Sequence, residues 1–99
     1  MLIKFLNEQT GTLDWADAGD FQPSNVAFFT EGDYVHGRAT LADGKAHEIR
    51  SRIGNSREKA ERRVFQALQL SHAYLRPRPS REAIAAHLAR QPAAASPQP

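Results

Sequence analysis

Short apolar segments separated by turn residues make up the first third of the chain. Residues 2–6 form an apolar run that is too short for its period to distinguish a strand from one helical turn. Residues 7–25 are rich in Gly, Pro, Asn and Asp and are predicted to be irregular. Trp15 and Phe21 lie inside this loop and are expected to anchor it to the core. A strand is predicted over residues 26–30.

A β-hairpin is predicted over residues 34–53, because Asp43-Gly44 separates two alternating segments, 34–41 and 46–53. A two-residue turn mixes charged and apolar groups on both faces. A three-residue loop that pairs Ala42 with Ala46 places the apolar side chains on one face and the charged side chains on the other. This register is preferred because a slip of one residue would exchange the two faces. The predicted core side holds Val35, Ala39, Leu41, Ile49 and Ile53. The predicted charged side holds His36, Arg38, Thr40, Glu48, Arg50 and Arg52, with Arg38 opposite Arg50.

An amphipathic helix is predicted to follow the hairpin. Asn55 is the expected N-cap, and Glu58, three residues later, completes a variant of the capping box. Apolar residues recur at helical spacing: Ala60, Val64, Ala67, Leu68 and Leu75. The helix is expected to end near Arg76, because Pro77 and Pro79 cannot continue it.

A second, shorter helix is expected after Ser80, its predicted N-cap, with Ile84 and Leu88 on one face. Residues 91–99 lack an apolar pattern and are expected to form a disordered tail rich in Pro and Ala. The pattern therefore predicts one α+β domain over residues 1–90. In it an antiparallel sheet of three or four strands packs on one long helix, followed by the short C-terminal helix.

Composition narrows the class of protein. A chain of 99 residues with 40% hydrophobic residues supports one small core. The absence of cysteine excludes disulfides and thiolate zinc sites and fits a reducing, cytoplasmic environment. No apolar run approaches the length of a membrane span, and the first residues do not resemble a signal peptide.

The net charge of +2 conceals a strong asymmetry along the chain. Residues 1–33 hold one base and six acids, a balance of −5, whereas residues 34–99 hold twelve bases and five acids, a balance of +7. Ten of the thirteen bases are arginine, whose planar fork of donors matches phosphate and the edge of guanine. This distribution favours a nucleic acid as the partner.

The residues that usually carry catalysis or bind metals are not arranged for either role. His36, His47, His72 and His87 are scattered, without the spacing of metal ligands. The serines lack a nucleophile-elbow context, and there is no glycine-rich phosphate loop. We therefore expect no enzymatic activity, no metal and no cofactor.

The basic stretch over residues 50–63 continues the charged face of the hairpin into the start of the long helix. Helix N-termini present unpaired N–H groups and the positive end of the dipole, which suit phosphate. The candidate nucleic-acid-binding residues are His36, Arg38, Arg50, Arg52, Asn55, Ser56, Arg57, Lys59, Arg62 and Arg63.

The helix start that follows the hairpin carries a family resemblance over about residues 33–70. Ser56, a base at Arg57 and Ala60 stand where double-stranded RNA-binding domains carry a serine, a base and an alanine, and the chain resembles that family there. The resemblance implies phosphate binding by the start of the helix. Of the three positions that would hold the phosphate-binding bases, two are Glu58 and Glu61 here.

Two other architectures compete. A three-stranded sheet followed by a helix resembles the arm-binding domains of phage-type integrases, which read the major groove with the sheet. That resemblance implies contacts from His36, Arg38, Thr40, Arg50 and Arg52. A strand followed by two helices, the second capped by Ser80, resembles ribbon-helix-helix repressors, in which each protomer of a dimer contributes one strand.

The function expected from the sequence is binding of duplex DNA or RNA by a small accessory or regulatory protein. The alternative is a protein-interaction module, such as a small inhibitor, that uses the acidic, aromatic segment 14–33. The positions of Trp15, Phe21, Phe28 and Phe29 distinguish the two, because exposed aromatic residues would favour a protein partner. The sequence also leaves open whether the protein forms a homodimer.

Overall fold

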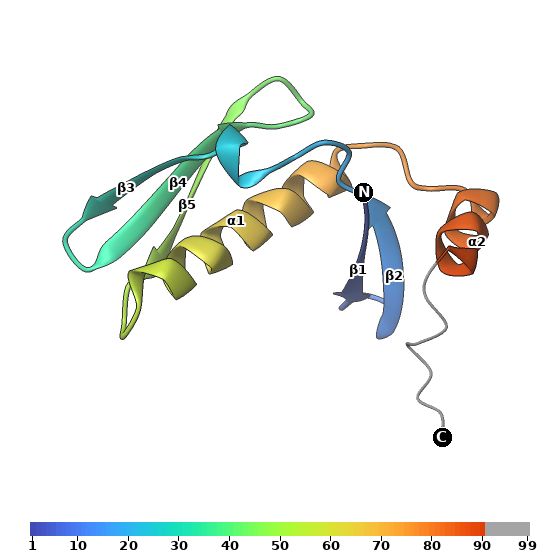
Figure 1. The fold of residues 1–99 in the computed structure, drawn as a ribbon, viewed down its shortest axis with the longest axis horizontal. Helices are drawn as coiled ribbons and strands as arrows, with labels where there is room; N and C mark the ends of the chain where they lie inside the picture. The colour runs from blue at the N-terminus through green and yellow to red at the C-terminus, as the bar shows by residue number, and fades with distance from the viewer. Residues whose placement is uncertain (91–99) are drawn as a thin grey trace.

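The computed structural model describes residues 1–90 and has an α+β fold with two antiparallel sheets and two α-helices (Figure 1). The strands are β1 (Leu2–Asn7), β2 (Thr12–Asp17), β3 (Ala27–Glu31), β4 (Tyr34–Thr40) and β5 (Ala46–Arg52). A short 3₁₀ helix covers Pro23–Asn25, and the α-helices are α1 (Arg57–Tyr74) and α2 (Arg81–Ala89). β1 pairs with β2, and β3, β4 and β5 form the second sheet in that order. The tail predicted over residues 91–99 lies outside the described residues.

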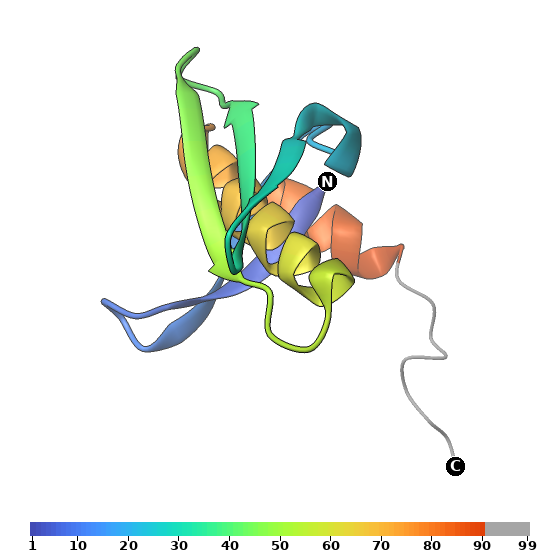
Figure 2. The ribbon, with the colours of Figure 1, turned by 90° about the vertical axis from the view of Figure 1, so that its left-hand side faces the viewer.

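Helix α1 covers one face of the β3–β4–β5 sheet, and no helix or strand of residues 1–90 covers the opposite face (Figures 1 and 2). Val35, Val64 and Leu68 are the largest fully buried side chains of the core between helix and sheet. Gly37 permits this close approach. A Cβ at position 37 would collide with Val64 and come within 3.0 Å of Val26.

The β1–β2 hairpin packs against the C-terminal part of α1. Its buried core is small and consists of Phe5, Ala16, Ala18 and Ala73, with Ile3 and Leu70 packed beside them. The prediction that residues 7–25 are irregular is wrong for β2. The turn at Gly11, which has φ +71°, closes a hairpin and does not belong to a long loop. For residues 2–6 the sequence left a strand and one helical turn open, and the structure shows that they form a strand.

The β4–β5 hairpin confirms the predicted faces and corrects the predicted pairs. Thr40 pairs with Ala46 and Arg38 with Glu48, so Arg38 does not lie opposite Arg50. The Leu41 N–H donates to the Lys45 carbonyl (3.1 Å), so the loop between these two residues has three residues, as predicted, but begins one residue earlier, at position 42. The Gly44 N–H donates to the Leu41 carbonyl (2.9 Å) with φ +77°, which places the glycine at the last position of the loop. A shift of two residues in the pairing leaves every side chain on its predicted face.

A serine caps the N-terminus of each of the two α-helices. The hydroxyl of Ser56, and not the side chain of Asn55, caps α1 by accepting from the Lys59 N–H at 3.2 Å. Asn55 lies inside a turn that the Ser56 N–H closes onto the Ile53 carbonyl at 3.3 Å. The helix ends at Tyr74, two residues before the predicted Arg76. Ser80 caps α2 as predicted, accepting from Ala83 at 3.0 Å.

Candidate nucleic-acid interface

The face of the β3–β4–β5 sheet that points away from α1 carries most of the exposed charge of this sheet. We call it the outer face. The strand register assigns to it every second residue of the three strands: Ala27, Phe29, Glu31, Tyr34, His36, Arg38, Thr40, Ala46, Glu48, Arg50 and Arg52.

Arg50 and Arg52 converge on one tyrosine of the outer face. Their guanidinium carbons lie 4.4 and 5.7 Å from the centroid of the Tyr34 ring, within the range of cation–π contacts. Hydrogen bonding from Arg52, followed by the charges of Arg52 and Arg50, lowers the pKa of Tyr34. The tyrosine therefore holds two arginines side by side on the outer face without neutralising either.

The three arginines of the outer face have one acidic cross-strand neighbour, Glu48 opposite Arg38, and its carboxylate contacts His36 instead. Arg38, Arg50 and Arg52 are exposed, and none forms an ion pair among residues 1–90. Their charges are therefore accessible to an anionic ligand.

His36 lies on the predicted face but is covered. Only 9% of its surface is exposed, because the Phe29 ring stacks on it at a centroid distance of 4.8 Å and an angle of 8°. Its Nδ1 lies 3.2 Å from a carboxylate oxygen of Glu48. His36 therefore supports the outer face from within, and the accessible ring at this point is that of Phe29.

Most of the candidate binding residues at the start of α1 form hydrogen bonds or ion pairs with neighbouring residues. Arg57 donates to Glu61 (3.0 Å), and Arg62 lies 3.7 Å from Glu58. Arg63 donates to the Ser51 hydroxyl at 2.9 Å and to the carbonyl of Arg52 at 2.7 Å. The Ser56 hydroxyl caps the helix, and Asn55 belongs to the preceding turn. Lys59 is exposed without an ion pair within residues 1–90.

The acidic N-terminal segment neutralises part of the basic half of the chain. Arg78 lies 2.7 Å from the carboxylate of Asp14, and Arg76 donates to the carbonyl of Asp17 (3.1 Å). The hydrogen bond from Arg78 lowers the pKa of Asp14, and the Gly19 N–H, supported by the N-terminal amine and then by Arg76, lowers that of Asp17. The charge asymmetry of the sequence is therefore reduced in the fold at this end and retained on the outer face.

The aromatic residues of segment 14–33 are divided between core and surface. Phe21 is buried and stacks on His72 at 4.9 Å, while Trp15 and Phe28 are half-buried. Phe29 is 39% exposed, and it belongs to the outer face. The segment therefore does not present its aromatic residues as one patch for a protein partner.

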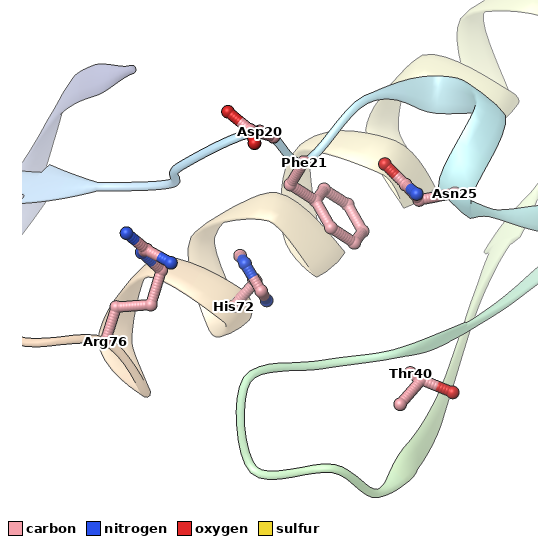
Figure 3. Close-up of a pocket in the computed structure, with 6 residues that line it drawn as sticks. All are labelled: Asp20, Phe21, Asn25, Thr40, His72 and Arg76. Carbon is pink, nitrogen blue, oxygen red and sulfur yellow. The ribbon is translucent and has the colours of Figure 1, made fainter.

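A shallow hollow of about 380 Å³ lies between α1, the loop before β3 and the end of β4 (Figure 3). Figure 3 shows Phe21 and His72 side by side, with Arg76 beyond the C-terminal end of α1 and Thr40 across the hollow. His72 Nδ1 is buried without a hydrogen-bond partner in residues 1–90. Burial, followed by the charge of Arg76, lowers the pKa of His72. The ring is therefore neutral near pH 7 and suits aromatic packing.

The candidate interface contains two residues that sequence reasoning did not include, Phe29 and Tyr34. Tyr34 could have been found, because it continues the alternation of His36 and Arg38 toward the start of β4. Phe29 could be placed only with the β3–β4 register, which pairs it with His36.

No family model, curated protein or solved structure matches the chain. Within residues 1–90 there is no group of three His, Cys, Asp or Glu side chains able to hold a metal ion. The helices in the same range are too short or too polar to cross a membrane.

Proposed function

We propose that the protein binds nucleic acid through its outer face, with duplex DNA or RNA as the expected ligand, and acts as a small accessory or regulatory factor. The observation that carries the proposal is the set of three exposed arginines, Arg38, Arg50 and Arg52, on a sheet face that no other element of residues 1–90 covers. Arginine binds phosphate and the edge of guanine through paired donors, which makes such a surface suited to both.

The sheet is a better candidate than the start of α1. Arg57 and Arg62 each have a glutamate partner one turn away, and a bound phosphate would have to compete with it. Arg50 and Arg52 instead contact the Tyr34 ring, whose face attracts cations without cancelling their charge. This contrast supports the integrase-like alternative over the one that resembles double-stranded RNA-binding domains.

A salt series tests the phosphate contacts. Three arginine–phosphate contacts predict that the logarithm of the association constant falls with the logarithm of salt concentration with a slope of about −3. Fluorescence anisotropy with labelled duplex DNA and duplex RNA measures it. A flat dependence at measurable affinity would contradict contacts to phosphate.

A pair of double variants of equal charge locates the surface. Arg50→Ala with Arg52→Ala should weaken binding by about tenfold or more, since it removes two of the three phosphate contacts and a hydrogen bond to a charged group contributes about 1.5–3 kcal/mol. Lys59→Ala with Arg62→Ala removes the same charge from the helix and should have the smaller effect. Circular dichroism checks that both variants fold. Unchanged affinity in the first variant would assign binding to the helix instead.

A further inference from the structure

The outer face carries an aromatic stack that contact with phosphate does not require. Phe29 lies on β3, an edge strand of the sheet, and one face of its ring lies against His36. The opposite face contacts no other ring in the described part of the chain, and the residue is 39% exposed. Part of the Phe29 ring is therefore accessible to a ligand at the edge of the sheet face that carries Arg38, Arg50 and Arg52.

The stack is held in place by His36, which lies opposite Phe29 on the neighbouring strand. His36 is buried and bonded to Glu48 at 3.2 Å, so its imidazole has little freedom to turn. Because the Phe29 ring lies parallel to this fixed imidazole, within 8°, its orientation is set before any ligand arrives. A preorganised surface loses less conformational entropy on binding than a mobile one.

The arginines of the outer face lie on both sides of the stack of Phe29 and His36. Tyr34 is two residues from His36 along β4, so the group formed by Tyr34, Arg50 and Arg52 begins about 7 Å along the strand from the stack. Arg38 lies two residues beyond His36 in the other direction. An extended strand of nucleic acid crossing the stack would therefore meet guanidinium groups on both sides.

We propose that the outer face recognises an unpaired base, which stacks on the free face of the Phe29 ring while the arginines bind the neighbouring phosphates. The proposal rests on the proposed function, that nucleic acid binds the outer face, and changes the preferred ligand from a fully paired duplex to a single-stranded or locally opened nucleic acid. A base inside a duplex is covered on both faces by its neighbours, whereas an unpaired base exposes a face to an aromatic side chain.

The test uses the full chain and three labelled oligonucleotides of equal length: single-stranded oligothymidine, the same backbone without bases, and a duplex. Stacking on an aromatic side chain contributes enough that Phe29→Ala should weaken oligothymidine binding roughly fivefold or more. Binding to the abasic strand should not change. Phe29→Trp should restore affinity, and Leu13→Ala, which shortens an exposed apolar side chain on β2, serves as the matched control.

The outcomes separate this proposal from the broader one. If Phe29→Ala leaves oligothymidine binding unchanged, or weakens binding to both single strands equally, base stacking is refuted while phosphate binding by the arginines stands. A change in sedimentation without a change in affinity would assign Phe29 to contact with a second copy and also refute stacking. If no oligonucleotide binds, both proposals fall. Thermal melting of Phe29→Ala and Phe29→Trp shows that each variant is folded.

Discussion

Helix α1 packs against two regions that are held together in different ways. Against the β3–β4–β5 sheet it buries aliphatic side chains, with Val35, Val64 and Leu68 fully enclosed. Against the β1–β2 hairpin it buries Phe5 and three alanines, and arginines beyond its C-terminal end contact Asp14 and Asp17. One region depends on apolar burial, and the other adds charge pairs at the surface.

The difference indicates where the stability of the protein lies. Full burial of a Val or Leu side chain contributes about 1.5–3 kcal/mol, whereas an exposed ion pair contributes about 0–1 kcal/mol. The sheet that supports the outer face is therefore the more stable region, and the hairpin is the region expected to open first. A surface that positions arginines and a ring against a ligand benefits from a rigid support.

Truncation of the sheet core gives the largest expected effect. Leu68→Ala removes a fully buried side chain between helix and sheet and should lower the free energy of unfolding by about 2–5 kcal/mol. Urea denaturation followed by circular dichroism measures it. Leu88→Ala, at a position that is 49% exposed on α2, should change stability by less than about 1 kcal/mol. Similar losses in the two variants would show that the sheet core is not the main source of stability.

His72 lies on α1 near the junction of the two regions, and its replacement should stabilise the fold. The variant His72→Phe keeps an aromatic ring stacked on Phe21 and removes the buried, unpartnered Nδ1, which should raise the free energy of unfolding by about 1 kcal/mol. Urea denaturation of the variant beside the parent protein measures the gain.

The same variant should change the pH dependence. The pKa of His72 is lowered in the fold, so the unfolded chain binds more protons once pH falls below the ordinary value of 6.5. The free energy of unfolding of the parent protein should therefore decrease as pH falls from 7 to 5. The His72→Phe variant should not show this decrease. Parallel curves for the two proteins would show that a hydrogen bond satisfies the ring.

Acid should separate the hairpin from the helix before it affects the sheet. The pKa values of Asp14 and Asp17 are lowered in the fold, so their contribution is complete above the unfolded value near 3.8 and is lost as pH falls through the folded values. Trp15, the one tryptophan of the chain, lies on β2, and its fluorescence should change before the circular dichroism of the sheet does. Asp14→Asn with Asp17→Asn should show the same opening near pH 6. Coincident transitions would mean that the two regions unfold as one unit.

The smallest effect is a shift in the titration of Tyr34. Arg52 and Arg50 lower its pKa, so an anion bound to the two guanidiniums should move that pKa back toward its ordinary value. NMR of the tyrosine rings during an alkaline titration, with and without oligonucleotide, measures the change. Arg52→Ala should raise the pKa in the absence of ligand. No movement on binding would place the phosphates elsewhere.

Alternation and helical spacing were enough to predict the β3–β4–β5 region and α1. They could not choose between registers that differ by two residues, because both place Arg38 and Arg50 on the same face. The strand β2 was missed because it buries only Ala16, so its polar residues resemble a loop. The bond between Asp14 and Arg78 joins residues 64 apart, and no local pattern predicts such a contact.

The three-residue loop 42–44, enclosed by the hydrogen bond from Leu41 to Lys45, determines where this hairpin can change in length. The pairing of β4 with β5 keeps Arg50 and Arg52 on the side of Tyr34 and away from Val64. A residue inserted among 42–44 would only lengthen the loop if the strand pairs are kept, whereas a slip of β5 by one residue against β4 would direct both arginines toward the apolar core. Changes in length should therefore be tolerated within residues 42–44 and not within β5, where one inserted residue would move the following side chains to the opposite face.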